Sequence, residues 1–266
     1  MRKIVALVRA SWLAAASYRL GIVMSFASML LGVVPIYFVA NALQPTMANV
    51  IRGEGSQYFG FLIVGMMVLN VVTATLYALP NAMATCTSNG TLEALFATPT
   101  STPVLLTGLA GYELLFALAR ALILFLAAAA LGTHVVWDRL ALALPVLLLV
   151  IVAHIPFGLM AAAMILAFRT VGPLPQVVFA LSAFLGGTYY PVHVIPGWIE
   201  KASRLLPMTY GLRAIRGVLL EGMSLRDVGR DVAILTLFTA GLMIAGALAF
   251  RAALRYARRA GTLAQY

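Results

Sequence analysis

The chain has 266 residues, of which 63% are hydrophobic and only 10% are charged, whereas an ordinary soluble domain has about a quarter of charged residues. So few charges cannot cover a soluble fold of this size, which excludes a soluble enzyme, a disordered chain and a secreted disulfide scaffold. The single cysteine, Cys86, excludes an intrachain disulfide. The three histidines lie far apart in the sequence, so we expect no metal site.

A formal net charge of +10 raises the question of nucleic acid binding. The basic residues, however, flank the apolar runs and do not form one basic face. We interpret them as determinants of membrane orientation and as contacts for anionic lipid headgroups. Membrane lipids are therefore an expected partner, and nucleic acid is not.

Apolar runs long enough to cross the hydrocarbon layer recur along the chain, since a spanning helix needs about 20 apolar residues. We expect six spans, at residues 20–43, 58–83, 113–132, 140–168, 175–190 and 232–250. The fifth is the shortest, and the fourth is interrupted by Pro145 and Pro156. The predicted fold is all-α, a polytopic membrane protein with six transmembrane helices.

Six spans place both ends of the chain on the same side of the membrane. Basic residues cluster before the first span and after the last, and the positive-inside rule assigns such flanks to the cytoplasm. These residues are Arg2, Lys3, Arg9 and Arg19 at one end and Arg251, Arg255, Arg258 and Arg259 at the other. The segment 191–231 is also basic and argues against this orientation. We predict a multi-pass protein of the plasma or inner membrane with cytoplasmic termini, because the termini directly adjoin long spans.

The N-terminal segment 1–19 has the pattern of an amphipathic helix. On a helical wheel Ile4, Val8, Ser11 and Ala15 share one side, and Arg9 points the opposite way. Such a helix lies in the membrane interface. It serves either as a simple anchor or as a docking surface for a cytoplasmic partner.

The segment 84–112 is predicted to face the cytoplasm. Asn89-Gly90 is a turn signal, and Thr91 can cap a short helix in which Glu93 suits the helix dipole. The segment is either an ordinary connecting loop or a short helix that contacts a cytoplasmic protein.

The segment 190–230 is too apolar for a free loop and too broken for a span. Three prolines, at 191, 196 and 207, divide it into short helices. Broken helices at membrane depth persist only when they are buried in protein or line a cavity. We expect a re-entrant helical segment on the external side.

Two motifs in these segments are recognisable. The stretch 189–222, with Tyr-Pro-x4-Pro-x-Trp and Leu-Pro-x-Thr-Tyr-x4-Ile-Arg, resembles the membrane subunit of ABC-2 type exporters. The stretch 90–99, Gly-Thr-Leu-Glu-Ala-Leu-Phe-Ala-Thr-Pro, is similar to the coupling segment of that family. The resemblance covers nearly the whole chain, so 1–266 would be a single ABC-2 type transmembrane domain.

The resemblance implies a transport function and a set of partners. Such subunits form dimers, with a second copy or a homologous permease, and pair with two cytoplasmic ATP-binding subunits for efflux of an amphiphilic, lipid, drug or glycan substrate. ATP and Mg would belong to the partner, and this chain would hold no cofactor. It also has no Gly-x4-Gly-Lys-Ser/Thr phosphate loop, so we expect no enzyme activity and no catalytic residue in it.

The resemblance also assigns residues. Those implied in coupling to the ATPase are Thr91, Leu92, Glu93, Phe96, Pro99 and Arg9. Those implied in the external re-entrant signature are Tyr190, Pro191, Pro196, Trp198, Pro207, Tyr210, Arg213 and Arg216. Position 213 departs from the family, because many relatives carry an acid there.

Two other classes of function are alternatives. An ion-gradient-driven transporter would need acids at the centres of spans, and spans one, two, four, five and six have none there. An intramembrane serine protease would need a nucleophilic Gly-x-Ser-x-Gly turn, which does not occur. His154 within the fourth span is either a proton relay or a structural interior residue. Glu113 and Arg120 share a helix face and form either a functional pair or a structural contact.

Overall fold

A computed structural model describes residues 2–259, which are helical with short connections and contain no strand. The elements in chain order are α1 (Arg2–Ala16), α2 (Arg19–Met47), α3 (Tyr58–Ser88), α4 (Leu92–Ala97), α5 (Thr102–Ala130), η1 (Trp137–Arg139), α6 (Leu140–Phe168), α7 (Leu174–Phe184), η2 (Val192–Val194), α8 (Gly197–Ser203), α9 (Pro207–Leu220) and α10 (Gly229–Arg259). This confirms the all-α prediction for the part of the chain that is described.

Among residues 2–259, five helices are long and apolar enough to cross a membrane: α2, α3, α5, α6 and α10. The fifth predicted span, 175–190, is the exception. Its helix, α7, has 11 residues, and at 1.5 Å per residue it is about 16 Å long, roughly half the thickness of the hydrocarbon layer. The turn at Gly186 and Gly187 ends it early, and Gly187 has the left-handed φ of +86° that favours glycine.

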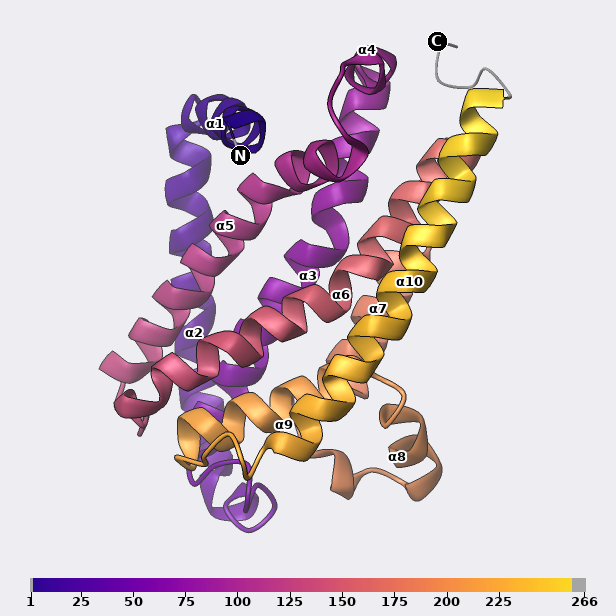
Figure 1. Cartoon of the computed structure of the whole chain (residues 1–266). Coiled ribbons are helices and arrows are strands. Elements are labelled where there is room, and N and C mark those ends of the chain that lie inside the picture. The colour runs from indigo at the N-terminus through magenta and orange to yellow at the C-terminus, as the bar shows by residue number, and fades with distance from the viewer. Residues whose placement is uncertain (1, 260–266) are drawn as a thin grey trace.

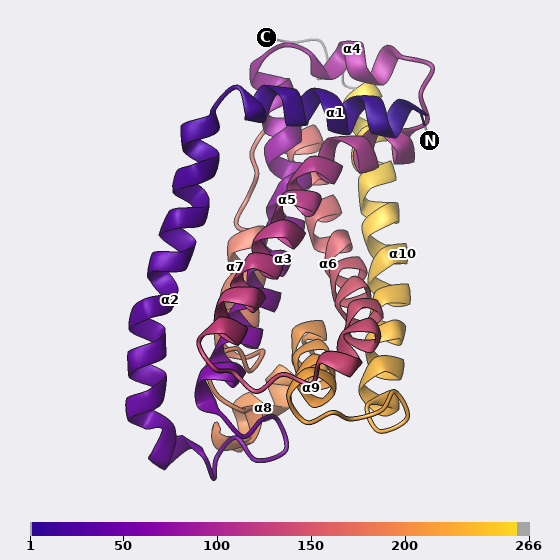
Figure 2. The ribbon, with the colours of Figure 1, turned by 90° about the vertical axis from the view of Figure 1, so that its left-hand side faces the viewer.

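The long helices run between two ends of the molecule (Figures 1 and 2). Helices α1 and α4 and the C-terminal end of α10 lie at one end, which we name the α4 end. Helices α8 and α9 lie at the opposite end, named the α9 end, where α9 runs across the direction of the long helices. The two segments that resemble the coupling and external regions are therefore at opposite ends.

The third long helix begins earlier than predicted. We expected the span to start near residue 113, but α5 starts at Thr102, with Pro103 in its first turn. Proline fits there because the first amides of a helix have no partner within the helix, and its fixed φ suits the start of a helix. Pro103 thus begins α5 and does not interrupt it.

Helix α3 is the central element, in contact with α2, α5, α6, α7 and α9. Glycines allow the closest approaches between helices: a Cβ on Gly158 of α6 would lie 2.8 Å from the carbonyl oxygen of Thr75 in α3. Helix α10 packs along α6, where a Cβ on Gly246 would lie 3.0 Å from Cα of Pro156. Close backbone contacts between helices therefore stabilise the central bundle in addition to the packing of side chains.

The segment 190–230 is divided into short helices at its three prolines, as the sequence predicted. Pro191 and Pro196 flank η2, and Pro207 begins α9. Helix α9 is amphipathic, and most of its residues are buried against the bundle. It is therefore a part of the packed core, although it lies at the end of the molecule.

Candidate functional site

Helix α4 is a short helix held by one buried side chain. Leu92 is 5% exposed and packs in an apolar cluster with residues of α3, α6 and α10, among them Met83, Leu166 and Phe250. Phe96 is half-buried at the edge of the same cluster, and Glu93 is exposed. The helix thus joins the bundle by one face and leaves an acid free to meet another molecule.

The residues around α4 differ in one detail from the prediction. Thr91 occupies the N-cap position but makes no side-chain cap. Its hydroxyl donates a hydrogen bond to the carbonyl oxygen of Cys86 at 3.3 Å, which closes the Asn89-Gly90 turn. The predicted helix is present, and the predicted capping bond is not.

The start of α1 is joined to the end of this segment. Lys3 Nζ donates to the carbonyl oxygen of Pro99 at 3.0 Å and lies 3.2 Å from Oγ1 of Thr100. Both views place α1 and α4 at the same end of the molecule, where α1 runs across the long helices (Figures 1 and 2). Arg9 of α1 is exposed at the same end. The six residues implied in coupling are therefore gathered at one end of the molecule.

Helix α1 rests on α5 through two glycines. A Cβ on Gly108 would lie 2.4 Å from Cδ1 of Leu7, and one on Gly111 would lie 2.7 Å from Cγ2 of Val8. Trp12 packs edge-on against Tyr112, with ring centroids 6.1 Å apart. Ile4, Val8, Ser11 and Ala15 are half-buried, so the predicted apolar side of the amphipathic helix is the side that packs.

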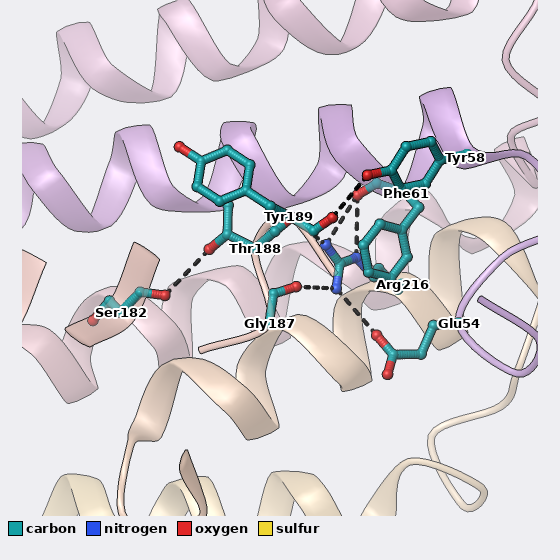
Figure 3. A network of polar contacts seen from close by, with 8 residues as sticks. All are labelled: Glu54, Tyr58, Phe61, Ser182, Gly187, Thr188, Tyr189 and Arg216. Carbon is teal, nitrogen blue, oxygen red and sulfur yellow. Dashed lines mark hydrogen bonds and ion pairs between the residues drawn. The ribbon is translucent and has the colours of Figure 1, made fainter. Parts of the chain in front are cut away.

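At the α9 end, the guanidinium of Arg216 is the centre of a buried cluster (Figure 3). Arg216 is 0% exposed. Nη1 donates to the carbonyl oxygen of Gly187 at 2.8 Å and to Oε2 of Glu54 at 3.1 Å. Nη2 donates to the carbonyl oxygens of Thr188 at 2.9 Å and of Phe61 at 3.0 Å, and Nε donates to Phe61 at 3.2 Å. One side chain thus joins α9, α3, the α2–α3 loop and the turn after α7.

The electrostatic environment keeps this guanidinium charged. Burial lowers the pKa of Arg216 to about 10, and the Glu54 carboxylate opposes that shift, so the group is protonated at neutral pH. Its carbon Cζ lies 3.4 Å from the ring centroid of Phe61, a cation–π contact. A Cβ on Gly65 would lie 2.7 Å from Nη2 of Arg216, so the guanidinium occupies the space that a larger residue at 65 would need.

The other signature residues are distributed around this cluster and do not form one site. The hydroxyl of Tyr210 donates a hydrogen bond to the carbonyl oxygen of Arg204 at 2.9 Å. The hydroxyl of Tyr190 donates one to the carbonyl oxygen of Phe184. Pro207 is buried at the start of α9. Trp198 in α8 is 75% exposed. These residues shape and orient the short helices, and none of them approaches the coupling residues at the α4 end.

Comparison with known proteins shows the family of the chain. The model of the family described as ABC-2 type transporter matches residues 2–220. The chain belongs to the ABC-2 type transporter family. It is 28% identical over 189 residues to nodulation protein J of Rhizobium meliloti (strain 1021), which is 68% of this chain and 69% of that protein. It is also 28% identical over 195 residues to nodulation protein J of Rhizobium leguminosarum bv. trifolii, 70% and 71% of the two chains.

Family membership fixes the general role of the chain. An ABC-2 permease is the membrane component of an ABC transporter, and ATP hydrolysis takes place on a separate ATP-binding subunit. The five long apolar helices accord with a multi-pass membrane protein.

The departure at position 213 has a structural counterpart in this permease. Arg213 lies 3.4 Å from Oδ1 of Asp231 at the start of α10, and its guanidinium lies 6.0 Å from the ring centroid of Tyr210. The arginine side chain is 46% exposed and that of Asp231 is 13% exposed, so the pair joins a surface arginine to a mostly buried acid. The basic residue at 213 therefore pairs with an acid that α10 supplies.

Two candidate functional groups lie within the predicted spans: His154, and the pair Glu113 and Arg120. His154 is fully buried, and Nδ1 lies 2.7 Å from the carbonyl oxygen of Val150, which can only accept. Its Nε2 has no hydrogen-bond partner among the described residues. Arg120 stacks on Phe116, and no ion pair joins it to Glu113 within residues 2–259. No described contact connects His154 to a second ionisable group.

Sequence reasoning did not find several residues of both sites. Lys3, Gly108 and Glu54 were not among the predicted residues, and neither was the Gly187 turn as a hydrogen-bond acceptor. A signal existed only for Glu54, an acid within an apolar chain that has 8 acids in all. Lys3 acts through its side chain on a backbone carbonyl, the Gly187 turn acts through its carbonyl oxygen, and Gly108 acts through the absence of a side chain; a single sequence indicates none of these roles.

Proposed function

We propose that this ABC-2 permease is the transmembrane subunit of an exporter that works as a dimer with two cytoplasmic ATP-binding subunits. The whole chain, 1–266, acts as one transmembrane domain of a plasma or inner membrane. The α4 end faces the cytoplasm with both termini, and the external re-entrant segment 190–230 faces outside. The observation that carries this proposal is that α1 and α4 lie at the same end of the molecule and are linked there by Lys3 and Pro99.

The surface of α1 and α4 has the properties of a docking surface for the ATPase. Glu93 and Arg9 are exposed there, while Leu92 and Lys3 fix the two elements to the bundle. A displacement of α4 is passed to α3, which it follows in the chain, and through Lys3 to α1 and α5. The coupling segment 84–112 thus reaches the central helix by short, packed connections.

The α9 end has the properties of a closure on the opposite side. Helix α9 crosses the ends of the long helices (Figure 1) and is fixed to α3 by Arg216. Movement of α3 therefore changes the position of α9. In this proposal nucleotide-driven motion at the α4 end reaches the external segment through α3.

A second copy of this chain, or a homologous permease, would complete the pathway. Helix α2 is almost wholly exposed, with only 6% of its apolar window buried, and a single copy with five long apolar helices among its described residues and no internal repeat in its sequence would not enclose a path by itself. The exposed surfaces of the long helices are apolar. This favours a substrate with an apolar part, such as a lipid, a drug or a lipid-linked glycan.

The test of coupling uses the permease reconstituted with its ATP-binding subunit in lipid vesicles. The variants Glu93→Gln and Phe96→Ala are expected to reduce the stimulation of ATP hydrolysis by at least about fivefold, while assembly into the membrane is unchanged. Glu221→Gln is the matched control, because Glu221 is an exposed acid at the other end. Equal stimulation in all three variants would place the coupling surface elsewhere.

The orientation has its own test. On a Cys86→Ala background, a cysteine at position 198 should react with a membrane-impermeant thiol reagent added from outside, since Trp198 is exposed on α8. Reaction with the reagent only from the cytoplasmic side would invert the proposed topology.

A further inference from the structure

One face of α10 has an unusual division into apolar and basic parts. Residues spaced alternately by four and three positions lie on the same side of a helix. On α10 this series is Leu237, Gly241, Ile244, Leu248, Arg251, Arg255 and Arg258. The face is therefore apolar along most of its length and becomes basic toward the α4 end.

The apolar part is exposed and grooved. Leu237, Ile244 and Leu248 are 74%, 64% and 59% exposed. A groove of about 290 Å³ lies at Gly241, where a Cβ would meet no atom within 4 Å. Its lining is apolar and comprises Ile234, Leu237, Phe238, Gly241 and Leu242. The missing side chain at 241 thus leaves a shallow slot along the helix.

The basic part is a second groove on the same helix. It measures about 390 Å³ and is lined by Leu248, Arg251, Leu254, Arg255 and Arg258. The three arginines are exposed, and Leu254 is buried at its base. Within residues 2–259 no ion pair joins any of these arginines to an acid. Three positive charges therefore converge on one groove without a described counter-charge.

The spacing of the two grooves matches one leaflet of a bilayer. Ten positions separate Gly241 from Arg251, and a rise of 1.5 Å per residue makes this about 15 Å. The hydrocarbon layer is about 30 Å thick, so half of it is about 15 Å. When Arg251 lies at headgroup height, Gly241 lies near the middle of the membrane.

We propose that this face binds an anionic phospholipid of the leaflet at the α4 end. The guanidinium groups of Arg251, Arg255 and Arg258 hold the phosphate by charge-assisted hydrogen bonds, and an acyl chain lies along Leu248 and Ile244 into the groove at Gly241. An anionic headgroup fits better than a zwitterionic one, because the latter brings a positive charge of its own toward the three arginines. This inference goes beyond the transport function proposed above.

A lipid suits this face better than the ATP-binding subunit does. Leu248 lines the basic groove and also belongs to the apolar part of the α10 face. That apolar part lies on a helix that can cross the membrane. A cytoplasmic protein has no access to Leu237 or Ile244. A single amphiphilic ligand accounts for both grooves, whereas a protein partner accounts for the arginines alone.

The experiment measures phospholipid that stays bound to the purified full-length permease, by native mass spectrometry after exchange into an equal mixture of phosphatidylglycerol and phosphatidylcholine. The wild type should retain phosphatidylglycerol in preference. The triple variant R251Q/R255Q/R258Q should weaken this retention by about 100-fold, since each arginine near the surface contributes about 1 kcal/mol and 1.4 kcal/mol is tenfold. The matched control R52Q/R226Q/R230Q removes three exposed arginines near the other end and should retain the lipid.

A second variant tests the acyl-chain groove without changing charge. Gly241→Leu fills the slot and should lower retention of phosphatidylglycerol by about tenfold, with no loss of thermal stability, because a Cβ there meets nothing within 4 Å and leucine is a better helix former than glycine. Equal loss in the control triple variant would reduce the effect to net charge and overturn the site. Displacement by inorganic phosphate alone, or a change of oligomeric state in place of a change in lipid, would also overturn it, in favour of a phosphate site or a contact between copies.

Discussion

Nη1 of Arg216 lies 3.1 Å from Oε2 of Glu54, and the two residues are 162 positions apart in the chain. The arginine is fully buried, while 16% of the Glu54 side chain is exposed. Glu54 comes from the loop that joins α2 to α3, and Arg216 from α9. The ion pair therefore joins the α2–α3 loop to α9, so that the positions of both elements depend on this one pair of charges.

Replacement of Arg216 by methionine should destabilise the permease strongly. The carbonyl oxygens of Phe61, Gly187 and Thr188 would lose their donor, and Glu54 would keep an unpaired, partly buried charge. Breaking one partner of a buried pair costs about 3–5 kcal/mol, which thermal unfolding in detergent should detect. Arg213→Met is the matched control: it also leaves an acid that is mostly buried, since Asp231 is 13% exposed, but its own guanidinium is 46% exposed and has no backbone carbonyl partner among the described hydrogen bonds, so we expect a smaller loss than for Arg216→Met. Equal stability of the two variants would contradict the role assigned to Arg216.

Gly65→Ala should disturb the same cluster from the opposite side. A Cβ at 65 would lie 2.4 Å from the carbonyl oxygen of Thr188 and 2.7 Å from Nη2 of Arg216, so the turn and the guanidinium would have to move. We expect a loss of at least about 2 kcal/mol in unfolding free energy. Gly32→Ala is the control, because a Cβ there meets nothing within 4 Å and alanine favours a helix by about 1 kcal/mol over glycine. A stable Gly65→Ala variant would show that the cluster adapts.

Gly108→Val should separate α1 from the bundle and weaken coupling. The added side chain would occupy the place of Leu7, whose Cβ lies 2.8 Å from the position of a Cβ at 108. The expected result is a lower stimulation of ATP hydrolysis in the reconstituted complex, with normal membrane insertion. Gly32→Val serves as the control for the change of residue type within a long helix. Normal coupling in Gly108→Val would mean that α1 does not act through α5.

His154→Leu should leave transport unchanged. The histidine has one described hydrogen bond, to the carbonyl oxygen of Val150, and an Nε2 without a described partner, so a proton has no described group to pass to. A volume-conserving apolar replacement in a core usually costs less than about 1.5 kcal/mol. Transport measured in vesicles at pH 6 and pH 8 should respond to pH alike in the variant and the wild type. A selective loss of transport in the variant would revive the proton relay as an interpretation.

The long helices were predictable from the sequence because they depend on the length of uncharged runs. The limits of the predictions follow from local features: α5 starts at Thr102 because Pro103 fits a first turn, and α7 is short because the chain turns at Gly187. In each case the apolar run continues beyond the helix end or begins after its start. Composition therefore locates a span, and backbone geometry decides its ends.

The sites were predictable only in part. Family motifs indicated the positions of Glu93 and Arg216, since both lie within recognisable short patterns. The partners of Arg216 are mainly carbonyl oxygens, and the one from Phe61 is 155 positions away. Every residue has a carbonyl group, so no residue type marks it as a partner. The sequence gives no signal for Gly108 either, because this glycine contributes only by leaving room for the side chain of Leu7.

The short helix α7 leaves backbone carbonyls after residue 184 without partners in a helix, and the guanidinium of Arg216 supplies donors to two of them, at Gly187 and Thr188. In lipid an unsatisfied peptide group is costly, so the break in α7 is tolerable only while the arginine is present. An attempt to build chimaeras by exchanging the segment after α7 between relatives would therefore have to carry the arginine, its acid and the receiving turn together. Those three parts depend on one another in the folded protein, although they lie far apart in the chain.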